Sequence, residues 1–94
     1  MPIEKYLQTL GIYDQGELTN RGSYVITIDN SNDYGKMFSK LEKADDLDIL
    51  TDNQVITEQG SSLMYESITE PFLFNLIADF DGDIYQLVIT ELED

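Results

Sequence analysis

The sequence predicts an α+β fold in which a small antiparallel sheet of about five strands carries two helices packed on it. Three observations support this. Two segments in the first half repeat apolar residues at helical spacing, and the second half changes to short, strand-like segments. The last two of these segments flank an Asp-Gly pair, a strong hairpin signal. The length of 94 residues suits a single domain over residues 1–94.

The first helix is expected from Pro2 to about Leu10. Its apolar side chains recur at the spacing of one helical face: Ile3, Tyr6, Leu7 and Leu10. Pro2 suits a first helical turn, and Gly11 suits the left-handed residue that closes a helix. Ile12 could then pack back on the last turn. Residues 14–22 are rich in turn formers and are expected to connect this helix to the sheet.

A strand is expected over residues 23–29 and a second helix after it. Tyr24, Ile26 and Ile28 alternate with more polar residues, so they should share the buried face of the strand. Asn30 or Ser31 is a suitable N-cap for a helix that runs to about Ala44. The apolar residues of this helix again have helical spacing: Tyr34, Met37, Phe38 and Leu41.

Short strands are expected after Ala44, over residues 48–51, 54–58 and 62–68. Residues 72–80 and 83–90 then form the best-defined unit. A two-residue Asp81-Gly82 turn, with positive φ at both positions, pairs Phe80 with Asp83. This register places one set of side chains on a single face that must be buried: Phe72, Phe74, Leu76, Ala78, Tyr85, Leu87 and Ile89.

The composition disfavours catalysis. The chain has no histidine and no cysteine, which excludes Ser-His and Cys-His nucleophilic catalysis and thiolate metal sites. No glycine-rich phosphate loop is present, and the run Asp79–Asp83 does not have the spacing of an EF-hand loop. We therefore expect a protein that is not an enzyme and that needs no cofactor or metal. A secretion signal and an apolar run of membrane-spanning length are lacking, so a cytoplasmic protein is expected.

Charge is the most informative property. The formal net charge is −14, which repels nucleic acids and anionic membranes and attracts basic proteins. Residues 1–41 carry five acidic and four basic side chains, whereas residues 42–94 carry fourteen and one. Such acids on strands and turns could replace the phosphates of a nucleic acid in a protein groove, or they could be an ordinary solvated face. The candidate positions are Asp45, Asp46, Asp48, Asp52, Glu58, Glu66 and Glu70.

An apolar groove is a second candidate feature. Met37, Phe38 and Leu41 on the second helix, together with Met64 on a middle strand, could line a groove between helix and sheet. Methionine adapts well to an inserted side chain. Plain core packing is the alternative for the same four residues.

In its layout the chain resembles the phage-encoded inhibitors of uracil-DNA glycosylase, which are acidic DNA mimics. The clearest local match is Glu66–Phe74, a polar stretch with a proline and an aromatic residue that leads into a strand. The resemblance implies two helices on a five-stranded antiparallel sheet. It also implies that Asp29, after the first strand, contacts the DNA-binding loop of the enzyme. The family's apolar pocket, which receives a side chain from that loop, would here be lined by Met37, Leu41 and Met64.

These observations favour an inhibitor that occupies the DNA-binding groove of a host enzyme, first of all uracil-DNA glycosylase, in the cytoplasm of a bacterial host cell. The expected partner is a basic DNA-binding protein of DNA repair or defence, with no direct binding to nucleic acid or membrane. Three alternatives stay open. One is an anti-CRISPR or other phage anti-defence protein that uses the same mimicry. Another is an acidic structural or interaction module, either monomeric or a homodimer formed through a sheet edge. The third is a cation-binding domain, which calcium would stabilise against thermal unfolding.

Overall fold

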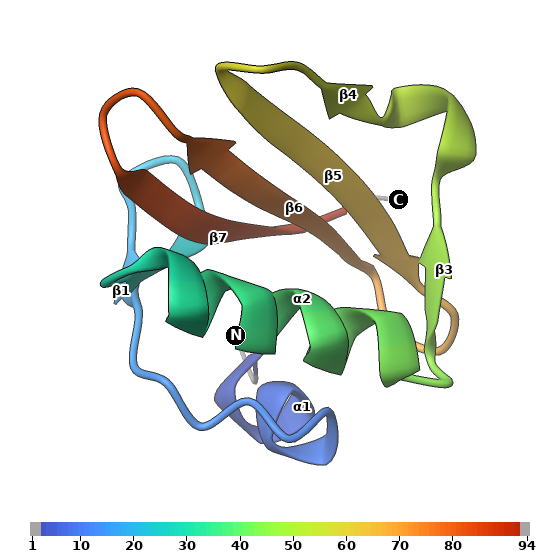
Figure 1. The fold of residues 1–94 in the computed structure, drawn as a ribbon. Helices are drawn as coiled ribbons and strands as arrows, with labels where there is room; N and C mark the ends of the chain where they lie inside the picture. The colour runs from blue at the N-terminus through green and yellow to red at the C-terminus, as the bar shows by residue number, and fades with distance from the viewer. Residues whose placement is uncertain (1–2, 93–94) are drawn as a thin grey trace.

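The computed structural model describes residues 3–92, which form two helices and one antiparallel sheet (Figure 1). The helices are α1 (Ile3–Thr9) and α2 (Ser31–Lys43), and a single 3₁₀ turn, η1, covers Thr51–Asn53. The strands are β1 (Glu17–Leu18), β2 (Ser23–Ile28), β3 (Leu47–Ile49), β4 (Val55–Ile56), β5 (Gly60–Ser67), β6 (Phe72–Asp79) and β7 (Ile84–Glu91). The α+β class predicted from the sequence is confirmed.

The strands lie in the order β1-β2-β7-β6-β5-β3, and β4 pairs with β5 beside β3. Within residues 3–92 the sheet therefore has seven strands, more than the five or so expected. β1 lies in the segment that was expected to form turns. It was not predicted, because a strand of two residues is too short to show alternation. The early strand β2 joins the sheet by pairing with β7.

Both helices begin or end at the residues that their capping signals indicate. The side chain of Asn30 accepts a hydrogen bond from the backbone N–H of Asp33 at 2.8 Å, which makes it the N-cap of α2. Gly11 has a φ of 80°, and the N–H of Ile12 reaches back to the carbonyl of Leu7 at 2.9 Å. This is a Schellman closure of α1, and Ile12 is buried behind it. Pro2, predicted in the first turn, lies outside the described residues.

The core lies between the helices and one face of the sheet, here called the inner face. Ile3 and Leu7 of α1 and Met37 and Leu41 of α2 are buried against it. The hairpin face predicted from the sequence is confirmed, since all seven of its residues are buried. The other face, here called the open face, carries neither helix (Figure 1). The sheet is thus covered on one side only.

The β6–β7 hairpin has the predicted register but a different turn. Ala78 pairs with Tyr85, and the ladder closes at Asp79 and Ile84, so the loop has four residues instead of two. Positive φ occurs at Asp83, with a value of 54°, and not at the Asp81-Gly82 pair. The carboxylate of Asp79 accepts a hydrogen bond from the N–H of Gly82 at 3.2 Å, which holds the longer loop together.

The outer edge of β5 is completed by a side chain. β3 and β4 both pair with β5, and η1 separates them. In the gap, the amide nitrogen of Gln54 donates to the carbonyl of Met64 at 3.0 Å, and its oxygen accepts from the N–H of Met64 at 3.3 Å. The same nitrogen donates to the carbonyl of Leu50 at 2.6 Å. The Gln54 amide therefore replaces a backbone partner where the strand is interrupted.

Adding a methyl group at two glycines should change the free energy of unfolding in opposite directions. A Cβ at Gly60 would lie 2.3 Å from the backbone carbonyl oxygen of Ala78, whereas a Cβ at Gly35 in α2 meets nothing within 4 Å. We expect Gly60→Ala to lower the free energy of unfolding by about 2 kcal/mol or more, and Gly35→Ala to raise it by about 1 kcal/mol. Urea unfolding of both variants tests this, and equal effects would contradict the close approach at Gly60.

Candidate functional site

An open apolar groove lies between α2 and the outer strands of the sheet, here called the α2 groove. It has a volume of about 350 Å³. Its residues come from one side of α2, from β3, β4 and β5, from the link between η1 and β4, and from the β6–β7 loop. They are Tyr34, Phe38, Glu42, Ile49, Gln54, Ile56, Ser61, Leu63 and Phe80.

The helical spacing of α2 produces this groove. Tyr34, Phe38 and Glu42 follow one another at intervals of four residues, so they form a single row along the helix. Met37 and Leu41 form the neighbouring row, which is buried in the core. The first row is left facing β4, where Ile56 is 75% exposed, while Phe38 is 37% and Phe80 45% exposed. Apolar side chains of this size, gathered at one opening, are typical of a binding site.

Aromatic packing holds the walls of the groove in place. The ring of Tyr34 packs against Tyr85 with a centroid distance of 5.3 Å, and Phe80 packs against the same ring at 6.4 Å. The hydroxyl groups of Tyr34 and Ser61 lie 3.0 Å apart, which links α2 to β5. These contacts reduce the motion of the aromatic side chains, so less conformational entropy is lost when a partner binds.

Tyr65 lies beside the groove in the core, where its hydroxyl has no hydrogen-bond partner among the described residues. Burial, followed by the negative charge of Glu42, raises the pKa of this phenol well above its ordinary value. Glu42, which is exposed, supplies the one carboxylate among the groove residues.

The structure does not bring together the four apolar residues predicted to line a groove. Met37 and Leu41 are 3% and 1% exposed and belong to the core. Met64 pairs with Asn75 on the open face, because its neighbours Leu63 and Tyr65 occupy the inner face. A groove does lie beside the second helix, but other residues line most of it. Of the four residues proposed from the sequence, Phe38 alone lines it.

The eight candidate acids do not form one continuous ridge. Asp48 and Glu66 are directly opposite each other on β3 and β5, on the open face. Asp29 precedes α2 and Asp45 follows it, so these two lie at opposite ends of a 13-residue helix. The remaining exposed acids lie in η1 and in two turns, at Asp52, Glu58 and Glu70.

Asp46 has a structural role. Its carboxylate accepts hydrogen bonds from the hydroxyls of Tyr6 at 2.6 Å, Thr69 at 2.7 Å and Ser67 at 3.1 Å. These contacts, with that of Tyr6 the largest, hold the pKa of Asp46 below its ordinary value. They connect α1 to the turn between β5 and β6. Because three donors already engage this carboxylate, it is less available to a partner than the other acids.

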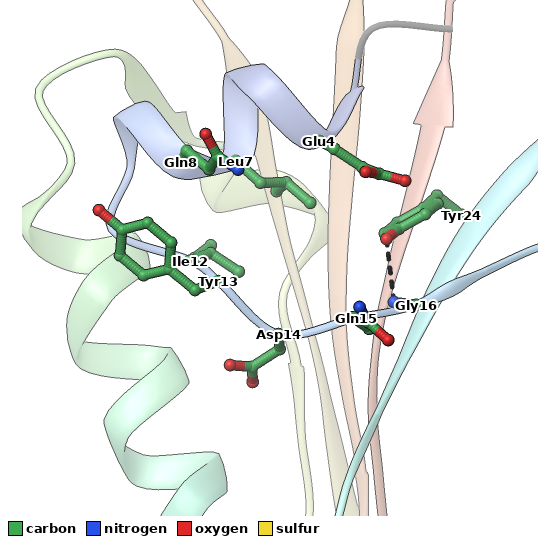
Figure 2. A pocket seen from close by; sticks show the side chains of 9 residues that line it. All are labelled: Glu4, Leu7, Gln8, Ile12, Tyr13, Asp14, Gln15, Gly16 and Tyr24. Atoms are coloured by element: carbon green, nitrogen blue, oxygen red, sulfur yellow. Dashed lines mark hydrogen bonds between the residues drawn. The ribbon is translucent and has the colours of Figure 1, made fainter.

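A second hollow lies beside α1 (Figure 2). Its backbone wall is fixed by a hydrogen bond from the N–H of Gly16 to the hydroxyl of Tyr24 at 2.9 Å. A Cβ at Gly16 would lie 2.6 Å from the Tyr24 ring, so the loop depends on close packing there. Most of the side chains around this hollow are polar, and we regard the α2 groove as the stronger candidate site.

No group of three or more acidic side chains within residues 3–92 is arranged to hold a metal ion. Neither α1 nor α2, the helices of the described chain, has the length and apolar character needed to cross a membrane. Comparisons of the chain with protein-family models, curated proteins and solved structures gave no match.

Several groove residues were not predicted, because they come together only in the folded chain. Ile49, Ile56 and Phe80 belong to three separate segments that the sheet brings beside α2. Glu42, in contrast, could have been found from its spacing to Tyr34 and Phe38, which predicts a shared helix face.

The contact between Tyr6 and Asp46 predicts how the stability of the fold changes with pH. Burial, and then the hydrogen bond to Asp46, raise the pKa of Tyr6 to about 12, against about 10 in the unfolded chain. The unfolded state therefore loses this proton first, and the stabilisation present below pH 10 is lost as the pH rises towards 12. We expect Tyr6→Phe to be less stable than wild type at pH 8, and the difference to shrink by pH 11.5.

Urea unfolding at both pH values measures this difference. Tyr13→Phe is the matched control, because it removes an exposed hydroxyl from the α1–β1 loop. If the difference in the free energy of unfolding between wild type and Tyr6→Phe stays constant from pH 8 to pH 11.5, the raised pKa of Tyr6 is contradicted.

Proposed function

We propose that this chain is a DNA-mimic inhibitor that occupies the DNA-binding groove of a basic enzyme, with uracil-DNA glycosylase as the first target to test. The α2 groove is the observation that carries the proposal. It offers an apolar volume of about 350 Å³ on a chain whose net charge is −14. An apolar site on an acidic protein suits a basic protein that presents an apolar side chain.

The two parts of the surface would contribute differently to binding. Exposed acids such as Asp52 and Glu58, on either side of β4, increase the rate of association with a basic surface. The groove then buries an apolar side chain against Phe38, Ile56 and Phe80, which lowers the rate of dissociation. Salt screens the first contribution and leaves most of the second.

The resemblance to uracil-DNA glycosylase inhibitors agrees in layout with this arrangement. Two helices on an antiparallel sheet and an apolar groove beside the second helix are parts of what the resemblance implies, whereas the seven strands of the described sheet and the residues that line the groove differ from it. The acids are more dispersed than a continuous row of phosphates. For this reason the proposed target class is any basic enzyme with a DNA-binding groove, which includes the targets of phage anti-defence proteins.

Titration of purified uracil-DNA glycosylase tests the target. We expect stoichiometric loss of uracil excision from a labelled oligonucleotide. The inhibition should weaken only partly between about 50 and about 300 mM salt, a range over which exposed charges become screened. Full activity at a molar excess of the chain would rule out this enzyme. The same titration against DNA-binding defence nucleases would then test the wider class.

Phe38→Ala tests the groove. Truncating a central aromatic residue in a binding site should weaken inhibition by about tenfold or more. Tyr13→Ala is the matched control, since Tyr13 is 73% exposed and lies outside the groove. Unfolding curves establish that both variants fold. Equal inhibition by wild type and Phe38→Ala would show that the partner does not use the groove.

A further inference from the structure

The open face of the sheet is more apolar than a solvated face needs to be. Antiparallel sheets that are covered on one side commonly carry polar residues on the other. Here five partly buried apolar side chains point outward from neighbouring strands. They are Val25 on β2, Val88 on β7, Leu73 and Ile77 on β6, and Met64 on β5.

The register makes these residues neighbours. Val25 pairs with Val88, Val88 with Asn75, and Asn75 with Met64, so they form one row across four strands. Leu73 and Ile77 stand on either side of Asn75 along β6. Charged residues lie at the margin of this patch, where Glu66 pairs with Leu73 and Asp79 pairs with Ile84. Ile84 and Val55, which are 58% and 56% exposed, extend it at its margin.

The charges around the patch have one sign. Glu17 pairs with Val25 at one edge of the sheet, and the Asp48–Glu66 pair lies at the other. The four lysines of the chain all lie on the two helices, and the one arginine lies in the β1–β2 turn. Asp48 and Glu66 face each other directly, an arrangement that destabilises a sheet unless a cation lies nearby.

We propose that the open face is a second docking surface, for a protein whose contact patch has an apolar centre and a rim of lysine or arginine. Charge complementarity selects this occupant, because an apolar patch with an acidic rim matches a basic rim and repels nucleic acid and anionic lipid. A second copy of this chain would place Glu17, Asp48 and Glu66 near the same acids. The α2 groove lies on the other side of the sheet, so both surfaces can be occupied at once.

A cationic amphipathic peptide provides a probe for this surface. A 14-residue peptide that repeats Leu-Lys-Lys-Leu-Leu-Lys-Leu presents an apolar stripe between lysines. A peptide of the same composition in scrambled order is the control. Titration into the isotope-labelled chain should shift the amide resonances of β2, β5, β6 and β7 at the open face. An absence of shifts at the open face, or equal shifts there with the scrambled peptide, would overturn the proposal.

Two variants separate this surface from the groove. Val25→Thr with Val88→Thr keeps the shape and strand preference of both residues while removing a methyl group from each. At the amide resonances of the open face, this double variant should show about tenfold weaker peptide binding, whereas Phe38→Ala should leave the binding measured at those resonances unchanged. If the folded double variant binds the peptide as tightly as wild type does, the proposal is wrong. It is also wrong if light scattering shows that the wild-type chain is a dimer and that the double variant is not, since a second copy would then cover the open face. Inhibition of uracil-DNA glycosylase should be unaffected by the double variant, so this test is independent of the proposed function.

Discussion

The burial of the inner face of the sheet under α1 and α2 is the constraint on which the rest of this structure depends. The central strands β6 and β7 contribute residues such as Phe74, Leu76 and Leu87 that are fully enclosed, and the buried residues of both helices belong to the same core. Because α2 must place Met37 and Leu41 towards this core, its adjacent row of Tyr34, Phe38 and Glu42 is turned to the outer strands. The α2 groove is thus a by-product of the same helical periodicity that builds the core.

Much of the fold could be predicted because its signals are local. The caps at Asn30 and Gly11 depend on a few residues each, and the register of the β6–β7 hairpin follows from strict alternation over eight residues. The turn of that hairpin was predicted wrongly, since a carboxylate three residues upstream of Gly82 stabilises a longer loop than the Asp-Gly pair suggests. β1 could not be predicted, because a strand of only two residues leaves no periodic pattern, even though it pairs with β2, the next strand along the chain.

The candidate site was harder to predict than the fold. The sequence indicates that a groove beside the second helix is plausible, and periodicity alone cannot say which of two adjacent rows will face the core. Met37 and Phe38 are neighbours in the chain, yet one is enclosed and the other lines the groove. In the same way, the list of acids does not reveal that Asp46 joins α1 to the β5–β6 turn. Each of these distinctions depends on contacts between segments far apart in the chain.

The Gln54 amide has a consequence for how the molecule behaves at high concentration. The outermost strands of an open sheet present unpaired backbone groups that can recruit another chain and begin aggregation. On this molecule the outer side of β5 offers no long vacant stretch, because β3, the Gln54 side chain and β4 take up successive parts of it. β3 and β4 are themselves only three and two residues long, and an acid at Asp48 lies on the first of them. A protein that exposes an apolar face and an apolar groove is thereby protected from joining its sheet to that of a neighbour along this border.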